Sequence, residues 1–358
     1  MSDQTLMMVG PTEIEQDILQ LASKKMIYFR SPKFSRMMEE ITDGLQYVFQ
    51  TQNHVFTLTS SGTGAMEAAV VNTLNAEDNV ISVNGGVFGE RWGKICRSYG
   101  INVNEIMLKP GQALKTEQIG QLLSNDTKAV FLTVNETSTG TLTDIASIGN
   151  ILRGTNILLI VDAISSICVE PLLTDAWGID IAVASTQKGL ALPPGLSFLS
   201  FSSKAFDRMQ TARLPKFYFQ LKEYQRFVPM SQFPFTPAIS LLFQLNARLE
   251  KIRHEGIENM IQRYAGLTQK LRNGLDKLGL EPFGENPANS VILYLLPPGI
   301  HSDKVVDLLE MRHGIILSHN APGPLRDRFL RVGILGNLAE DDMTRFIDAL
   351  KDVMSRVK

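Results

Sequence analysis

Short apolar runs alternate with helical patterns between residues 55 and 202. Several of the runs are apolar throughout, which is typical of strands buried on both faces of a parallel sheet. The predicted strands are 55–61, 79–86, 128–136, 157–165, 180–188 and 196–202, and the predicted helices are 64–75, 90–100 and 144–154. This order predicts an α/β unit in which helices cover both faces of a mostly parallel sheet.

The pattern changes after residue 202. A polar, aromatic segment is followed by a long helical pattern from about Ile239 to Leu280, which is interrupted at 254–256. The remainder mixes strand and helix patterns and predicts a smaller α+β unit. Its predicted strands are 289–299, 314–320 and 328–335, and its predicted helices are 302–314 and 339–357. We therefore predict an N-terminal arm at 1–14, a large domain at 15–254 and a small C-terminal domain at 255–358.

Composition narrows the function to small-molecule chemistry. The 358 residues are 44% hydrophobic and 20% charged, with a net charge of -2. This balance argues against disorder, nucleic-acid binding and attraction to an anionic membrane. Cys96 and Cys168 have no zinc-type spacing, and no apolar run is long enough to span a bilayer. We expect a cytoplasmic protein without a metal site or a membrane segment.

The first candidate for chemistry is the stretch TLTSSGTGAMEAAVV, in which a strand runs into Ser60–Gly64 and then into a helix. Small residues let backbone N–H groups approach a phosphate, and a helix N-terminus favours an anion. The stretch is neither a Walker loop nor a GxGxxG motif, because Glu67 stands at the third glycine position. The alternative is a helix whose own hydroxyls satisfy its first turn.

Two charged residues follow apolar strand patterns. Asp162 ends the run ILLIVD, where ligands of α/β sheets bind, and a carboxylate there suggests a fixed cationic partner. Lys188 follows the run DIAVASTQ, and burial lowers the pKa of such an amine so that it can react with a carbonyl. The alternatives are a turn aspartate and a solvated loop lysine. Together with the anion cradle, however, the two residues match the needs of pyridoxal 5'-phosphate.

A series of motifs in a fixed order then resembles a known family. The chain is similar to the class V pyridoxal-phosphate aminotransferases of fold type I, in the alanine–glyoxylate and serine–pyruvate group. That resemblance implies a large domain with a mostly parallel seven-stranded sheet and a smaller α+β domain. The motifs are GPTEI, FRSPKF, SSGTGAMEAAVVN, NGGVFGERW, NETSTG, VDAISS, GIDIAVASTQKGLALPPGLSF, PFTPAISL and FLRVGILGN.

The resemblance implies a role for each matching residue. Lys188 becomes the Schiff-base lysine and Asp162 the partner of the pyridine nitrogen. Phe88 would stack on the cofactor ring, and Thr137 would lie near its ring oxygen. The residues implied for the cofactor phosphate are Ser61, Gly62 and Thr63, with Gln187 in contact with it or close by.

The same resemblance implies the substrate side and the assembly. Arg331 would grip the α-carboxylate of the substrate, and Gly10 would line the substrate side. Thr236 would reach the phosphate of a neighbouring subunit, which implies a homodimer with shared active sites. Many relatives have histidine where this chain has Phe29 and Asn135. The roles of these two residues and of Tyr218 in substrate choice are therefore left open.

The resemblance implies transfer of an amino group from a small L-amino acid, of the alanine or serine type, to a 2-oxo acid of the glyoxylate or pyruvate type. Two half-reactions at one site give ping-pong kinetics. The alternatives within the same cofactor chemistry are a 2-aminoethylphosphonate–pyruvate aminotransferase and a lyase. From a different class, the chain would be a non-catalytic partner protein that keeps this fold.

Overall fold

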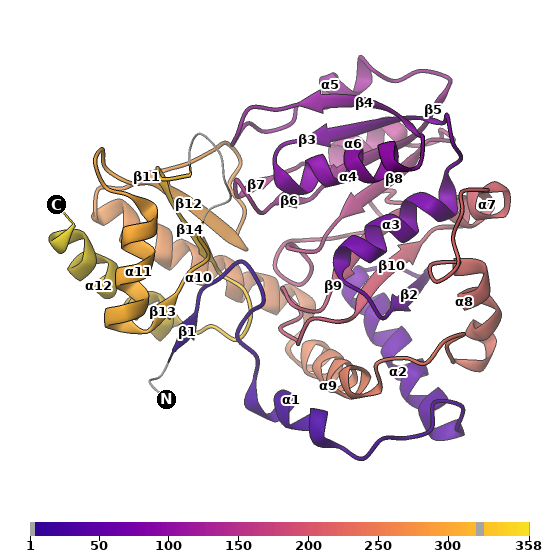
Figure 1. Cartoon of the computed structure of the whole chain (residues 1–358), viewed down its shortest axis with the longest axis horizontal. Helices are drawn as coiled ribbons and strands as arrows, with labels where there is room; N and C mark the ends of the chain where they lie inside the picture. The colour runs from indigo at the N-terminus through magenta and orange to yellow at the C-terminus, as the bar shows by residue number, and fades with distance from the viewer. Residues whose placement is uncertain (1–3, 320–325, 358) are drawn as a thin grey trace.

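A seven-stranded sheet forms the centre of the larger part of the molecule (Figure 1). The computed structural model describes residues 4–319 and 326–357. All neighbouring strands of the sheet are parallel except β10, which is antiparallel to both β9 and β2. The predicted mostly parallel sheet is thus confirmed. In spatial order the strands are β2 (His54–Leu58), β10 (Ser197–Phe201), β9 (Ile181–Ser185), β8 (Leu158–Asp162), β5 (Thr127–Thr133), β3 (Asn79–Asn84) and β4 (Asn102–Met107).

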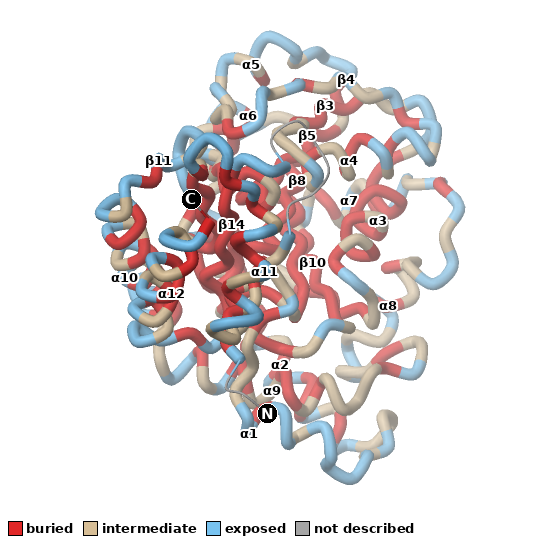
Figure 2. Tube along the Cα trace, turned by 60° about the vertical axis from the view of Figure 1, so that its left-hand side comes forward, coloured by how far each residue is buried: buried red, intermediate tan, exposed pale blue. Residues whose placement is uncertain are grey.

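Burial follows the sequence pattern strand by strand. Every residue of β8, β9 and β10 is buried, as their unbroken apolar runs predict. The sequence pattern does not predict β4, which is an edge strand whose residues are mostly exposed or half-buried. An edge strand with one exposed side lacks the apolar run that identifies its neighbours. Figure 2 shows the buried residues concentrated in the strands and in the helix faces turned toward them.

Helices flank the sheet and begin close to their predicted positions. The helix α4 is the main difference, because it starts at Val87 and so includes Phe88 in its first turn. Trp92 in α4 is buried against the sheet, where its indole N–H donates to the carbonyl of Leu132 at 3.2 Å. The helices before residue 230 are α1 (Gln16–Gln20), η1 (Leu21–Ser23), α2 (Pro32–Phe49), α3 (Gly62–Thr73), α4 (Val87–Ser98), α5 (Thr116–Gly120), α6 (Ile145–Leu152), α7 (Ser203–Thr211), α8 (Leu221–Phe227) and η2 (Val228–Met230).

The C-terminal part of the chain contains four of the described helices and a smaller antiparallel sheet. The strand order of this sheet is β11-β12-β14, and it lies apart from the central sheet in Figure 1. The predicted strand at 314–320 gives only a two-residue strand, which pairs with the N-terminal segment instead, and residue 320 lies outside the described residues. The elements are α9 (Ile239–Glu255), α10 (Ile257–Lys277), β11 (Glu281–Pro282), β12 (Val291–Leu295), α11 (Ser302–His313), β13 (Ile315–Ile316), β14 (Phe329–Gly333) and α12 (Glu340–Arg356).

The predicted interruption of the long helix is real. The helices α9 and α10 are separated by Gly256, whose φ of +86° favours a residue without a side chain. The division into domains at 254/255 falls beside this break and stays a prediction. Among the described residues no helix is both long and apolar enough to cross a membrane.

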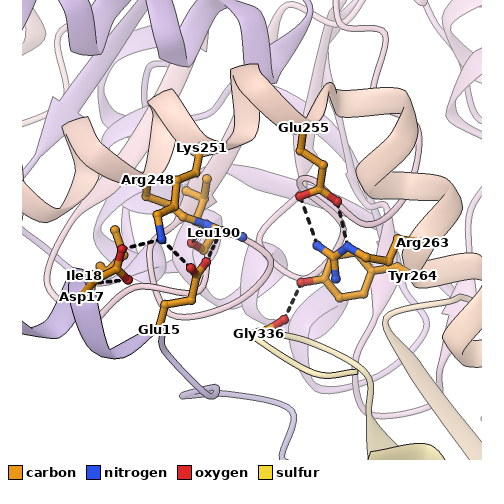
Figure 3. A network of polar contacts seen from close by, with 10 residues as sticks. All are labelled: Glu15, Asp17, Ile18, Leu190, Arg248, Lys251, Glu255, Arg263, Tyr264 and Gly336. Carbon is orange, nitrogen blue, oxygen red and sulfur yellow. Dashed lines mark hydrogen bonds and ion pairs between the residues drawn. The ribbon is translucent and has the colours of Figure 1, made fainter. Parts of the chain in front are cut away.

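The N-terminal segment contacts both β13 and α9. Its strand β1 (Thr5–Leu6) pairs in parallel with β13 in a separate two-stranded sheet. Further along, the Glu15 carboxylate is paired with Arg248 at 2.7 Å and with Lys251 at 2.5 Å, both on α9 (Figure 3). The Arg248 Nε donates in turn to the carbonyl of Leu190 at 3.0 Å. This ionic network therefore joins the N-terminal segment, α9 and the loop that carries Lys188.

Candidate functional site

The candidate residues meet where several strands of the central sheet end. The strand β8 ends at Asp162, and its parallel neighbour β9 ends three residues before Lys188. The strand β2 runs in the same direction and leads into Gly62, the first residue of α3. The carboxyl ends of these strands lie at one edge of the sheet, which is where open α/β sheets bind ligands.

Lys188 is buried and its amine is close to the N-terminal segment. The Nζ donates to the carbonyl of Val9, and a Cβ at Gly10 would lie only 2.8 Å from the lysine side chain. Burial lowers the pKa of Lys188 to about 8, Asp162 acts against this shift, and the charges of Arg331 and Arg91 add to it. The solvated loop lysine is therefore excluded, and part of the amine population is unprotonated near neutral pH.

Asp162 is 3% exposed and carries a carboxyl group whose charge is costly there. Burial raises its pKa to about 7. The hydrogen bond from the Ile164 N–H at 2.8 Å favours the charged form, and the neighbouring charge of Glu136 disfavours it. A cation placed against this carboxylate would restore its charge. The protonated nitrogen of a pyridine ring is a cation of the right kind.

The start of α3 has the features of an anion site. Ser61 precedes the helix in an extended conformation, and its side chain does not cap the first turn. The alternative of a self-satisfied N-terminus is therefore wrong. Gly62 packs so closely on Ile164 that a Cβ would lie 2.4 Å from its Cδ1, and Thr63 accepts a hydrogen bond from Arg91 at 3.0 Å. Backbone N–H groups of this turn stay available for a phosphate.

Phe88 lies in the first turn of α4 and faces two cations of the site. Its ring centroid is 6.0 Å from Lys188 Nζ and 4.8 Å from Arg91 Cζ. Neither Arg91 nor Glu136 was identified from sequence. The available signals were the helical spacing of Phe88 and Arg91 in FGERW, and an acidic residue at the end of an apolar strand pattern.

Arg331 and Thr137 approach one another from separate parts of the chain. Arg331 is buried in β14 and donates to the carbonyls of Thr137 at 3.5 Å and His319 at 2.9 Å. Within the described residues its Nε has no hydrogen-bond partner. Burial lowers the pKa of Arg331, and Glu136 opposes that shift. An unused donor on a buried guanidinium is suited to a carboxylate.

The remaining predicted residues lie around this centre. The Thr137 hydroxyl is 2.6 Å from that of Ser165, and Gln187 is half-buried directly before Lys188. Asn135 is buried and donates to the Ser290 hydroxyl. Thr236, in contrast, is exposed in the single chain, ahead of α9.

Pyridoxal phosphate fits these groups on chemical grounds. The site offers an amine of lowered pKa, a buried carboxylate that forms no ion pair with any described residue, and an uncapped helix start. They match its aldehyde, its ring nitrogen and its phosphate, respectively. The fold and the site together define an enzyme that uses this cofactor.

Comparison with known proteins identifies the family. The model of the class-V aminotransferases matches residues 17–324. An L-aspartate–glyoxylate aminotransferase of Paracoccus denitrificans is 33% identical, over 95% of this chain and 88% of that protein. A crystal structure of an alanine–glyoxylate aminotransferase from a Nostoc species superposes with a TM-score of 0.94 at 28% identity, covering 99% of this chain and 96% of that one. The chain belongs to the class-V aminotransferases, and pyridoxal phosphate is its cofactor.

Some relatives carry a different name. A protein called the small subunit of a soluble hydrogenase, from a Synechococcus species, is 35% identical over 100% of this chain and 94% of that protein. Among residues 4–319 and 326–357 no group of three or more His, Cys, Asp or Glu side chains is placed to hold a metal ion.

Proposed function

We propose that this enzyme moves an amino group from a small L-amino acid, of the alanine or serine type, to a 2-oxo acid of the glyoxylate or pyruvate type, by a ping-pong mechanism. The buried amine of Lys188 next to the buried carboxylate of Asp162 carries the proposal. The names of the Paracoccus and Nostoc relatives both contain glyoxylate, which supports this acceptor. Cys96 and Cys168 are both buried and form no disulfide, which is in keeping with a cytoplasmic location.

The reacting groups act as follows. Pyridoxal phosphate, when bound, supplies an electron sink for the bond that breaks at the substrate's α-carbon. Lys188 would hold the cofactor through its amine. Once released, its Nζ would carry the proton from the substrate's α-carbon to the cofactor carbon in one half-reaction and in the reverse direction in the other. Asp162 stabilises the positive charge on the ring nitrogen. Arg331 orients the substrate through its α-carboxylate.

The other residues hold the cofactor in place. The uncapped first turn of α3 binds the phosphate through Ser61, Gly62 and Thr63, with Gln187 beside it. Phe88 would cover one face of the ring and exclude water from it. Thr137 would lie near the ring oxygen, and Gly10, which packs against the Lys188 side chain, would line the substrate side.

We also propose a homodimer in which Thr236 reaches the phosphate of the partner's site. An apolar surface formed by the segments 26–30 and 217–230 supports this proposal. The two segments contact each other where the guanidinium carbon of Arg30 lies 4.8 Å from the ring centroid of Phe227. The surface includes Met26, Tyr28, Phe217, Tyr218 and Met230. These residues are 39% to 81% exposed in the single chain, and burial by a second copy would remove them from water.

The experiment that tests the function is visible absorption spectroscopy of the purified enzyme. Adding alanine or serine should bleach the band of bound pyridoxal phosphate, and glyoxylate or pyruvate should restore it. Lys188→Ala should abolish turnover and the band of the lysine-bound cofactor. A protein that binds the cofactor but responds to no amino acid would contradict the proposal and favour the non-catalytic partner.

The same experiment decides the related alternatives. Bleaching by 2-aminoethylphosphonate alone would identify a phosphonate aminotransferase. Repeated turnover to a keto acid without a 2-oxo acceptor would identify a lyase, because an aminotransferase stops after a single turnover per site. The desulfurase type of lyase is disfavoured, because burial raises the pKa of both Cys96 and Cys168 to about 12 and neither is a reactive thiolate.

A further inference from the structure

The first turn of α4 carries two side chains of the site, Phe88 and Arg91, but it has no capping side chain of its own. The residue before the helix is Gly86, and the first N–H groups of a helix have no acceptor within it. In this chain the acceptor is Glu136, which lies 48 residues further on. Its Oε2 accepts from the N–H of Phe88 at 3.1 Å and from that of Gly89 at 2.9 Å.

Glu136 is itself held firmly. It is 5% exposed, and its Oε1 accepts from the N–H of Ser138 at 3.1 Å and from the Ser138 hydroxyl at 2.5 Å. The contact with α4 is close, because a Cβ at Gly86 would lie 2.7 Å from the Glu136 carboxyl carbon. The carboxylate therefore joins β6 (Asn135–Glu136) to the first turn of α4 without a gap.

We propose that Glu136 is a positioning residue, whose carboxylate fixes the first turn of α4 and so holds the Phe88 ring over the cofactor pocket beside Lys188. The inference rests on the proposed function, which gives Phe88 its stacking role. Charge-assisted hydrogen bonds to backbone N–H groups are strong, and a negative charge at a helix N-terminus adds to them. Without them the Ser138 hydroxyl would still accept from the N–H of Val87 at 3.2 Å, but the N–H groups of Phe88 and Gly89 would lose their acceptor. The turn would then fray at Phe88 and move its ring.

Amide hydrogen exchange of the cofactor-free protein tests the anchoring directly. In Glu136→Ala the amides of Phe88 and Gly89 should exchange at least about tenfold faster, because they lose the carboxylate that accepts their hydrogen bonds. Glu170→Ala is the matched control, since Glu170 is also buried and accepts from the N–H groups of Asn289 and Ser290. That variant should speed exchange at residues 289 and 290 and leave 88 and 89 unchanged.

A double-mutant cycle on cofactor affinity tests whether Glu136 acts through Phe88. Glu136→Ala should raise the dissociation constant of pyridoxal phosphate about tenfold in the wild-type background and less than about threefold in a Phe88→Leu background. Equal effects in both backgrounds would overturn the proposal, and so would unchanged exchange at Phe88 and Gly89.

A milder variant covers the case in which Glu136→Ala does not fold. Glu136→Asp keeps the charge but withdraws it from α4 by one methylene, so exchange at Phe88 and Gly89 should rise by an intermediate factor. Wild-type exchange rates in this variant would contradict the proposal. A wild-type enzyme that binds the cofactor but transfers no amino group would contradict the proposed function alone, because exchange and cofactor affinity still decide the role of Glu136.

Discussion

The carboxyl group of Asp162 is buried, and burial makes its negative charge unfavourable. Its folded pKa of about 7 lies above the ordinary value of 3.8, so the folded protein binds this proton more tightly than the unfolded chain. The contribution of Asp162 to the free energy of unfolding of the cofactor-free protein therefore falls as the pH rises from about 4 to about 7. The stabilisation is fully present below pH 4 and is lost once the folded carboxyl ionises.

Asp162→Asn removes this pH dependence. The difference in unfolding free energy between the variant and the wild type, both without cofactor, should grow in favour of the variant by on the order of 2 kcal/mol between pH 5 and pH 8. Urea denaturation at the two pH values measures it. The variant should also lose most of its transaminase activity. If the difference in unfolding free energy between the variant and the wild type is the same at both pH values, Asp162 ionises normally in the folded protein.

Arg331 lies in the same site and acts on the substrate. Arg331→Lys keeps the positive charge but replaces a planar fork of donors by a single ammonium. We expect KM for the amino donor to rise about tenfold to hundredfold, which corresponds to one lost hydrogen bond to a charged group. Steady-state kinetics measure it, with Arg328→Lys on the exposed loop nearby as control. An unchanged KM would mean that another group holds the α-carboxylate.

The loop of Lys188 is fixed by close backbone packing. A Cβ at Gly189 would lie 1.9 Å from the carbonyl oxygen of Ile167, and backbone cannot move aside as a flexible side chain can. Gly189→Ala should therefore lower the free energy of unfolding by about 2 kcal/mol or more and weaken cofactor binding. Thermal denaturation and a cofactor titration measure the two effects.

Gly266→Ala provides the control for this substitution. Gly266 is exposed in α10, and a Cβ there would meet nothing within 4 Å. Because alanine is the better helix former, the variant should gain about 0.5–1 kcal/mol. If Gly189→Ala and Gly266→Ala have the same free energy of unfolding, the loop at Gly189 can shift to accommodate a Cβ, contrary to this prediction.

The elements differ in how far their sequence reveals them. Lys188 and Asp162 were predicted because each directly follows an apolar strand, and parallel neighbours end at the same edge. The strand β4 was missed because most of its residues are exposed. Glu136 was missed for another reason. Its partners Phe88 and Gly89 lie in a helix far away in sequence, and only the docking of α4 against β6 brings them together.

At the scale of the whole molecule, each active site of the proposed homodimer would contain residues from both chains. Thr236 is exposed in the single chain, whereas Lys188 is buried in the site, and the proposed homodimer would bring Thr236 of one copy to the phosphate site of the other. A change at either residue would then damage a site that is otherwise built from the opposite copy. This arrangement has a consequence that can be measured with two inactive variants.

Lys188→Ala lacks the reactive amine, and Thr236→Glu would place a carboxylate against the phosphate, so each homodimer should be inactive. In a mixed dimer, one site would combine both defects and the other neither. Equal amounts of the two variants, dissociated and reassembled together, should therefore regain about a quarter of wild-type activity, since half of the dimers are mixed and each has one intact site. If Lys188 and Thr236 of the same chain served one site, every site would carry a defect and the mixture would stay inactive.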